Sequence, residues 1–368
     1  MYDYDIAIVG GGLAGNSLAL ALKNTGLRIV ILEAQSMAQL KLSPSGDRAL
    51  ALAAGTVDAL YQLGAWQGID DLATPIETIH VSDQGHFAKS RLSARQYGVK
   101  ALGYVITGRD LEGHLLDIVE KQQNISYRHQ VSLQSIEQDE TTVKLCINGA
   151  LGKQQLRCRL LVGADGGMST VRTLLGIKQH RKDYGQTALV SSVKTGKHHQ
   201  NSAFERFTRS GPLALLPMGE QRCALVWTRT EQDAKRLLNA SEAVFIEELH
   251  QCFGYKLGQF TLDAPRHGFP LSLIRAQAMH QGRALILGNA VHQLHPVAGQ
   301  GFNLGLRDVM CLANRIRDCH QTGRDYSDNN FLYHYAQLRK SDHDMTIDFT
   351  DNLIKIFSSD FLALAAVR

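Results

Sequence analysis

The sequence predicts an α/β fold in which a Rossmann-like dinucleotide-binding domain carries an inserted antiparallel β-sheet and ends in C-terminal helices. Three observations predict it. Short buried strands run into glycine-rich segments at three separated places, near residues 10, 165 and 288. Alternating apolar and polar residues fill most of 184–227, which is typical of an antiparallel sheet with one covered face. The segment 326–368 has apolar residues at helical spacing.

The first 33 residues predict one strand–helix–strand unit. Asp5–Val9 is a short apolar run that ends in glycines, and Arg28–Leu32 is a second apolar run. Between them, Leu13–Thr25 has the leucine and alanine content of a buried helix, and Gly26 ends it. Together they predict one βαβ unit.

A dinucleotide-binding motif lies at the turn of this unit. Residues 10–15 (GGGLAG) fit G-x-G-x-x-G between the strand and the helix. Gly10 permits the tight turn, Gly12 lets a pyrophosphate approach the backbone, and Gly15 lets helix and strand pack closely. Glu33, at the end of the second strand, is placed to accept hydrogen bonds from ribose hydroxyls and disfavours a 2′-phosphate. The motif therefore predicts NAD or FAD, and the alternative is a glycine turn that binds nothing.

The pattern of apolar residues in the rest of the chain predicts further helices and strands in alternation. Helical patterns cover 48–64 and 109–122, and helices follow the glycine-rich loop 288–305 as far as 321 and again over 326–368. Strand patterns cover 77–82, 87–92, 125–129, 142–147, 160–163 and 284–287. We expect a discontinuous nucleotide-binding domain (1–75, 100–180 and 266–325), a substrate domain (76–99 and 181–265) and a C-terminal helical segment (326–368).

Composition excludes several other classes of protein. The net charge of +4 comes without a Lys/Arg-rich run interleaved with aromatics, so we expect no nucleic-acid partner. The six cysteines are scattered without a C-x-x-C pair, which argues against a zinc site or a disulfide framework. No secretory signal opens the chain, and no apolar run approaches the ~20 residues of a membrane span. We therefore expect a cytoplasmic protein.

Two later motifs choose between NAD and FAD. Residues 163–172 (GADGGMSTVR) and 288–305 (GNAVHQLHPVAGQGFNLG) resemble the D-G-x-x-S-x-V-R and G-D-A-A-H-x-x-x-P-x-x-G-Q-G-x-N-x-G fingerprints of flavin-dependent aromatic hydroxylases. The resemblance spans most of the chain. It is closest to the branch that hydroxylates polyprenylated phenols, such as 2-polyprenyl-6-methoxyphenol, in ubiquinone biosynthesis. Residues 47–56 (DRALALAAGT), 204–208 (FERFT) and 211–218 (GPLALLPM) carry this closer match.

The resemblance implies an FAD-binding domain of the glutathione-reductase type and assigns roles to its residues. Those expected around FAD are Gly10, Gly12, Ala14, Gly15, Glu33, Arg48, Arg109, Asp165, Asn289, Gly299, Gly301, Phe302 and Asn303. The first five would hold the ADP half, Arg48 and Arg109 the pyrophosphate and ribityl region, and residues 299–303 the isoalloxazine ring. Asn289 stands where the family usually has Asp, and we expect weaker FAD retention because charge-assisted hydrogen bonds are the stronger kind.

The resemblance also implies the reaction. NAD(P)H is the expected co-substrate that reduces FAD, and one oxygen atom of O₂ passes to a prenylated phenol in a site from which water is excluded. Leu215 and Pro217 are expected to line the substrate site. The sequence does not identify the catalytic base. His295 and Pro296 are the candidates, and a purely structural His295 is the alternative.

Several alternatives stay open. The enzyme could hydroxylate another ring position or a small soluble phenol, could reduce prenyl groups, or could be a non-catalytic FAD-binding subunit of a biosynthetic complex. His292 with His295, and His198 with His199, lack acidic or cysteine partners at ligand spacing, so we expect no metal. The apolar residues of the last segment predict either a helix docked on its own domain or a peripheral contact with partner proteins or the inner face of the cytoplasmic membrane. They are Phe349, Leu353, Ile354, Phe357, Phe361, Leu362 and Leu364.

Overall fold

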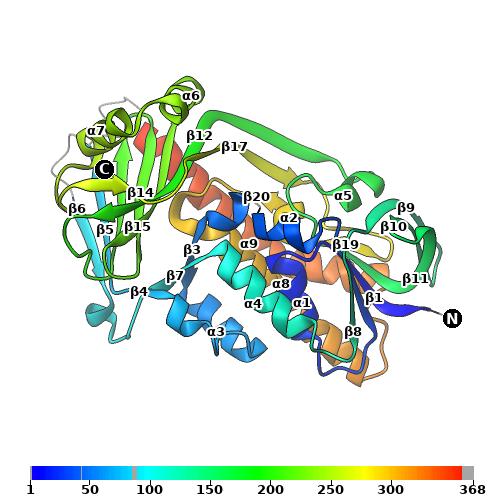
Figure 1. Ribbon diagram of the computed structural model, residues 1–368. Coiled ribbons are helices and arrows are strands. Elements are labelled where there is room, and N and C mark those ends of the chain that lie inside the picture. The colour runs from blue at the N-terminus through cyan, green and yellow to red at the C-terminus, as the bar shows by residue number, and fades with distance from the viewer. Residues whose placement is uncertain (1, 43, 85–88, 359–368) are drawn as a thin grey trace.

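A mixed sheet of eight strands carries the nucleotide-binding half of the molecule. The computed structural model describes residues 2–42, 44–84 and 89–358 (Figure 1). The main path of this sheet is β18 (His280–Gln281), β19 (Ala284–Ile286), β11 (Gly152–Gly163), β1 (Tyr4–Val9), β2 (Ile29–Leu32) and β8 (Ile125–Arg128). β19, β11, β1, β2 and β8 are mutually parallel, and β9 (Ser132–Gln138) and β10 (Val143–Gly149) extend β11 by antiparallel pairing. The carboxyl ends of the parallel strands therefore lie at one edge.

Helices cover this sheet because its strands are apolar on both faces. Every residue of β2 is buried, as expected for a parallel strand between helical layers. α1 (Leu13–Ala21) packs against α4 (Gly108–Val119) and α8 (Gln300–Gln321), and α8 also contacts α3 (Ala54–Leu63). Two shorter helices, α2 (Met37–Leu42) and α5 (Thr170–Leu174), follow β2 and β11.

A second, nine-stranded sheet forms the other half of the molecule. Its strands are β5 (Thr78–Asp83), β6 (Lys89–Ser93), β12 (Gln179–Thr195), β13 (Ser202–Thr208), β14 (Gly211–Met218), β15 (Arg222–Thr230), β16 (Phe260–Leu262), β17 (His267–Ala276) and β20 (His292–Gln293). α6 (Glu231–Asn239) and α7 (Glu242–Phe253) cover one of its faces (Figure 1). A small sheet of β3 (Ala49–Ala53), β7 (Gly103–Thr107) and β4 (Thr74–Ile76) lies between the two halves.

The long helix α9 (Asn329–Ser358) joins the two halves from the far side. It contacts α8 and β18 in the nucleotide-binding half and β13 and β14 in the second sheet (Figure 1). Near its end, Ile354 is 8% exposed and packs with Phe207 and Val297. The expected docking of this helix on its own chain is thus observed at Ile354, whereas Phe349 stays half-exposed. Phe361, Leu362 and Leu364 lie outside the described residues.

The structure differs from the sequence-based expectation in three places. Residues 48–64 form strand β3 before helix α3, because Ala49–Ala53 pair with β7 and this pairing overrides the helical propensity of alanine. The helices α6 and α7 were not predicted inside the sheet region. β17 and β20 pair within the second sheet, although the expected border at residue 266 placed them with the nucleotide-binding segments.

No helix in the described part of the chain is both long and apolar enough to cross a membrane.

Strand β14 shows what each face of the second sheet contacts. Leu215 is fully buried in the core with Trp227 and Phe245, between the sheet and its helices. Residues one position apart point to opposite faces, and Ala214 accordingly lines a cavity on the other side. Leu215 therefore faces away from this cavity, and its expected contact with the substrate stays a prediction. Pro217 shares the face of Leu215 and pairs with Cys223 of the same core.

Leu215→Ala is expected to lower the free energy of unfolding by about 2–5 kcal/mol, because a large buried side chain is replaced by a small one in a packed core. Urea unfolding followed by circular dichroism measures this change. The control is Leu216→Ala, which removes the same atoms from the half-buried neighbouring position and should destabilise less. If Leu215→Ala left the stability unchanged but altered the KM for a phenol, the result would indicate that Leu215 lines the substrate site.

Candidate active site

Three glycine-containing loops meet at the carboxyl edge of the parallel strands. Gly10 follows β1 with φ of +102°, and a Cβ there would lie 2.5 Å from the carbonyl oxygen of Ala164, which follows β11. Gly288 follows β19, and a Cβ there would lie 3.3 Å from the Cβ of Ala14. The structure therefore brings the three sequence motifs side by side, as ligand sites of open α/β sheets require.

The N-terminus of α1 has the features of a phosphate-binding site. No side chain caps it at Gly12, and its first turn has no acidic residue. A Cβ at Gly12 would meet only Oε1 of Glu112, at 3.9 Å, so a ligand can approach the backbone. At Gly15, in contrast, a Cβ would lie 2.0 Å from the carbonyl oxygen of Gly10. These residues fit the pyrophosphate of a dinucleotide at a helix N-terminus.

Glu33 is held rigidly beside this turn. Its carboxylate accepts hydrogen bonds from the backbone N–H of Gly11 and of Gln35, both at 2.8 Å. The hydroxyl of Tyr127 donates to the carbonyl oxygen of Gly11 at 3.2 Å, and it lies where a Cβ of Gly11 would be. The carboxylate is 8% exposed at the end of β2, where the ribose of a bound dinucleotide is expected.

A charged group that the sequence analysis missed lies across from the glycine turn. Burial raises the pKa of the Glu112 carboxyl, and the nearby positive charges of Arg48 and Arg109 offset part of that rise. Arg109 also pairs with Asp47 at 2.7 Å, and the guanidinium of Arg48 lies over the ring of Phe269 at 5.4 Å. The signal for Glu112 was its position one helical turn after Arg109 on α4, which places both on one face.

The side chain of Asp165 forms its hydrogen bonds within its own loop. Its carboxylate accepts a hydrogen bond from the Ser169 hydroxyl at 2.5 Å and another from the backbone N–H of Val171 at 3.0 Å. Arg172 then ties this loop to the loop after β19, because its guanidinium donates to the carbonyl oxygen of Ala290 at 2.9 Å. The expected contact of Asp165 with FAD stays a prediction, and its observed role is to shape the start of α5.

The loop before α8 is built from strained and tightly bonded residues. Ala298 and Gly299 have φ of 58° and 60°, and the left-handed region is uncommon for alanine. Asn303 accepts hydrogen bonds from the N–H of Ala53 and the hydroxyl of Thr56, and its amide donates to the carbonyl oxygens of Ala51 and Gly299. Its side chain therefore fastens the loop to β3.

The remaining residues expected in this loop differ in exposure. Asn289 is exposed, Gly301 has open space where a Cβ would be, and Phe302 is half-buried against the nucleotide-binding core. A planar ring could approach the backbone at Gly301 without displacing a side chain.

His295 does not have the features of a catalytic base. It is 1% exposed, packs edge-to-face against Tyr184 at 5.3 Å, and burial lowers its pKa to about 4. Its Nδ1 accepts from the N–H of Val297 at 3.2 Å. A neutral imidazole that accepts at Nδ1 carries its proton on Nε2. Its one basic lone pair, on Nδ1, is therefore already used in this hydrogen bond and is not available to take a substrate proton. The alternative that His295 has a purely structural role therefore agrees better with its surroundings.

Pro296 borders a narrow cavity of about 10 Å³ between the loop and the second sheet, which is room for about one water molecule. The opposite wall comes from three neighbouring strands, β13, β14 and β15. The lining residues are Glu205, Pro212, Ala214, Val226, Thr228, Pro296 and Val297. In the sequence, Glu205 belongs to the segment 204–208 (FERFT), and nothing in that pattern marks it as facing a cavity.

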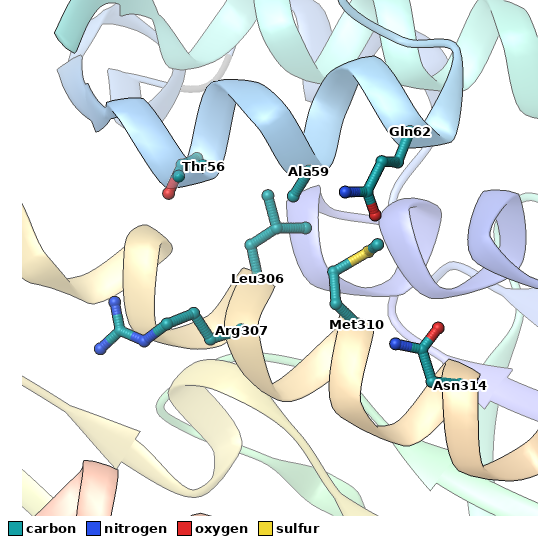
Figure 2. Close-up of a pocket in the computed structure, with 8 residues that line it drawn as sticks. Thr56, Ala59, Gln62, Leu306, Arg307, Met310 and Asn314 are labelled. Atoms are coloured by element: carbon teal, nitrogen blue, oxygen red, sulfur yellow. The ribbon is translucent and has the colours of Figure 1, made fainter.

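A separate groove lies between α3 and α8 (Figure 2). Thr56 and Ala59 line it from α3, and Leu306 and Met310 line it from α8. The charged residue in its lining, Arg307, is paired with Asp342 at 2.8 Å. Among the residues that line this groove there is therefore no carboxylate, histidine or cysteine that could act as an acid or base.

A buried carboxylate anchors the loop that contains Pro296. Asp308 on α8 is fully buried and is bonded by Nε2 of His292 at 3.2 Å, Nε2 of His343 at 2.8 Å and the guanidinium of Arg339 at 2.6 Å. Burial alone would raise the pKa of Asp308, but the hydrogen bonds from the two histidines hold it well below its usual value.

The same three side chains could be considered as metal ligands. One ligand atom from each of His292, Asp308 and His343 lies within 4.8 Å of the others. Arg339 already binds the carboxylate, and a fixed positive charge at that oxygen disfavours a second cation there. The expectation of no metal stays a prediction, and we interpret the cluster as a hydrogen-bond network.

Comparison with known proteins gives one family for nearly the whole chain. A family profile described as "FAD binding domain" matches residues 3–341. The chain is 33% identical to ubiquinone hydroxylase UbiL of Rhodospirillum rubrum, over 99% of this chain and 84% of that protein. It is 28% identical to 3-demethoxyubiquinol 3-hydroxylase of Escherichia coli, over 99% and 92% of the two chains.

A solved structure supports the fold. The crystal structure of pqsL, a probable FAD-dependent monooxygenase of Pseudomonas aeruginosa, superposes with a TM-score of 0.82 at 20% identity, over 99% of each chain. The α/β fold with a Rossmann-like domain and a second sheet is thus shared with that protein.

Asp308→Asn is expected to lower the free energy of unfolding at pH 7 by about 3–5 kcal/mol, because it leaves buried cationic partners without their carboxylate. The pKa of Asp308 is depressed in the folded state. Its contribution is therefore present above the pKa of an unfolded Asp, about 3.9, and is lost as the pH falls further. Thermal unfolding of both proteins between pH 3 and 7 measures the difference, which should shrink below about pH 4.

The control for this prediction is Asp342→Asn, which removes a partly exposed carboxylate of α9 that pairs with the same arginine, Arg339. Equal destabilisation by the two variants would contradict a special role of Asp308.

Proposed function

Because this chain belongs to the family of flavin-dependent aromatic hydroxylases that share this FAD-binding domain, we propose that it hydroxylates a polyprenylated phenol of ubiquinone biosynthesis with NAD(P)H and O₂. It is an FAD-dependent monooxygenase. One observation carries the proposal furthest. The FAD-type glycine loops meet at a sheet edge directly beside a mainly apolar cavity that ends at Pro296.

The residues proposed to hold FAD fit the group. The turn at Gly10, Gly12, Ala14 and Gly15 would hold the pyrophosphate, and Glu33 the adenosine ribose. Arg48, Arg109 and Asn289 would contact the pyrophosphate and ribityl chain, and Gly299 to Asn303 the isoalloxazine ring, with open space at Gly301 for its approach. When bound, FAD supplies electron transfer from NAD(P)H and oxygen activation. The protein's own part is to orient the phenol and to keep water away from it.

The phenol is proposed to enter between β14 and Pro296, where the cavity must widen to admit the ring. Ala214, Val226 and Val297 would contact the ring through carbon atoms, which excludes water and favours transfer of oxygen to the ring. The relatives named as ubiquinone hydroxylases support a prenylated phenol such as 2-polyprenyl-6-methoxyphenol. The relative named as a 3-hydroxylase of demethoxyubiquinol favours hydroxylation at another ring position as the second candidate.

A prenylated substrate resides in the bilayer, so we further propose a peripheral contact with the inner face of the cytoplasmic membrane. Phe349 on α9 is 52% exposed and is one apolar residue available for it. Contact with other proteins of ubiquinone biosynthesis is the alternative use of this surface.

Asn289→Asp is expected to tighten FAD binding roughly 3- to 10-fold, because a carboxylate forms stronger charge-assisted hydrogen bonds with ribityl hydroxyls than an amide does. Quenching of FAD fluorescence on titration with the apoprotein measures the dissociation constant. Asn314→Asp, an amide on α8 in the groove of Figure 2, is the control. Unchanged or weaker binding of FAD by Asn289→Asp would argue against a ribityl contact.

The proposed activity is tested by anaerobic reduction of the FAD-loaded protein with NADH or NADPH, with and without a short-chain 2-prenyl-6-methoxyphenol. We expect faster bleaching of the visible flavin band with the phenol, followed by a hydroxylated product when O₂ is admitted. Mass spectrometry and the position of the new hydroxyl group distinguish the two candidate reactions. Reduction without any product would instead favour a prenyl reductase, and failure of NAD(P)H to reduce FAD would favour a non-catalytic subunit.

A further inference from the structure

The cavity beside Pro296 contains one carboxyl group. Of the described residues that line it, Glu205 is the only one with an ionisable side chain, and Pro212, Ala214 and Val226 surround it with carbon. Thr228 adds a buried hydroxyl without a hydrogen-bond partner. A carboxyl group in such surroundings is costly to keep charged, so its presence there needs an explanation.

Glu205 forms no side-chain hydrogen bond or ion pair with the described residues of the chain. It lies in the middle of β13, where its backbone pairs with Ala214 on one side and Val81 on the other. The next residue, Arg206, faces the opposite side of the sheet and donates to the carbonyl oxygen of Cys252 at 2.7 Å. The nearest arginine in the sequence is therefore not its partner.

No titratable group on the described elements around the cavity is bonded to Glu205. Lys182 of β12 pairs with Asp351 of α9 at 2.8 Å, and Tyr184 donates to the same Asp351. The other titratable or charged residues on these strands and before the loop are His80 and Asp83 on β5, His180, Arg181, Asp183 and Lys194 on β12, Arg206 on β13, Arg222, Cys223 and Arg229 on β15, His267 and Arg275 on β17, and His295. None of them contributes to the ionisation of Glu205, which burial alone determines.

We propose that Glu205 is the proton acceptor for the substrate phenol, an inference that rests on the proposed hydroxylase function. Its carboxylate takes the proton of the phenolic O–H: that bond breaks, and a new O–H bond forms on a carboxyl oxygen of Glu205. The resulting phenolate is richer in electrons at the ring carbons beside and opposite its oxygen, where the new hydroxyl group is added. The ring regains its aromaticity when the carbon that received the hydroxyl group loses its proton, which leaves in the water formed from the second oxygen atom of O₂. The proton held by Glu205 returns to the phenolic oxygen, so Glu205 ends as it began.

The protonation behaviour of Glu205 suits this role. Burial raises the pKa of Glu205 to about 7, and a general base works best when its pKa lies near the pH of the reaction. A phenol resembles tyrosine, with a pKa near 10, and its deprotonation therefore needs an acceptor at neutral pH. The buried hydroxyl of Thr228 is available to donate a hydrogen bond to the same oxygen or to the carboxylate.

The decisive variant is Glu205→Gln, which keeps the shape of the side chain and removes its basicity. We expect hydroxylation of a short-chain 2-prenyl-6-methoxyphenol to slow by at least about 100-fold. In the wild type, kcat/KM should rise with pH through about 7 and then level off, because the carboxyl must be ionised to accept the proton. That rise should be absent in Glu205→Gln. An unchanged rate with the same pH profile would overturn the proposal.

A more acidic substrate tests the role of Glu205 without relying on loss of activity. An analogue of the same phenol that carries fluorine only at ring carbons that are not hydroxylated has a more acidic hydroxyl. Assayed at a pH above the pKa of this analogue, it is already ionised and should restore most of the activity of Glu205→Gln. A merely structural Glu205 predicts no such recovery, and its absence would also overturn the proposal. Glu220→Gln, in the exposed turn between β14 and β15, is the matched control and should behave as the wild type.

Folding and binding are followed separately. Because the pKa of Glu205 is raised in the folded state, its protonated form is favoured by folding below the pKa of an unfolded Glu, about 4.3, and this contribution is lost as the pH rises through about 7. Glu205→Gln should therefore be at least as stable as the wild type at pH 8.

The ultraviolet spectrum of the bound phenol gives a readout without turnover: wild type at pH 8 should bind it as phenolate and Glu205→Gln as neutral phenol. If wild type forms no product from any phenol, the proposed function fails. If it forms product and binds the phenol as neutral, only the role of Glu205 fails.

Discussion

The active-site side of this molecule depends on one buried carboxylate, Asp308, which joins three separate elements. Asp308 belongs to α8, His292 comes from β20, and His343 and Arg339 come from α9. A buried ion network of this kind adds little net stability compared with apolar packing, but breaking it leaves charges without partners. Its main effect is therefore to select one arrangement of loop, α8 and α9.

That arrangement also positions one wall of the cavity. With α9 fixed against α8, its far end places Ile354 on Phe207 and Val297, and Val297 is itself part of the cavity wall. The loop is fixed from the other side by the four hydrogen bonds of Asn303. Glu205 lines the opposite wall, and its burial between the loop and the sheet raises its pKa to about 7.

The sequence predicted the nucleotide-binding edge well and the substrate side poorly. A glycine with positive φ such as Gly10, or one packed against a backbone such as Gly15, leaves a signature in a few neighbouring residues. Strand β14 leaves no such signature, because Leu215 and Ala214 are both apolar and only the position of α6 and α7 decides which face is the core. The absence of a partner for Glu205 is likewise a property of the folded chain, since Arg206 is its neighbour in sequence and yet faces away.

Three features of the cavity wall are unfavourable by themselves. Among the described residues, Glu205 has no side-chain partner, the hydroxyl of Thr228 has none, and Ala298, next to Val297 in the wall, has a left-handed backbone. Such features persist only where the surrounding structure enforces them. Unpaired buried polar atoms also occur elsewhere in the described chain, so the distinguishing property of Glu205 and Thr228 is their position in a cavity beside the loop. An apolar residue at 205 would be the more stable choice, and a site retained for chemistry keeps such a residue at some loss of stability.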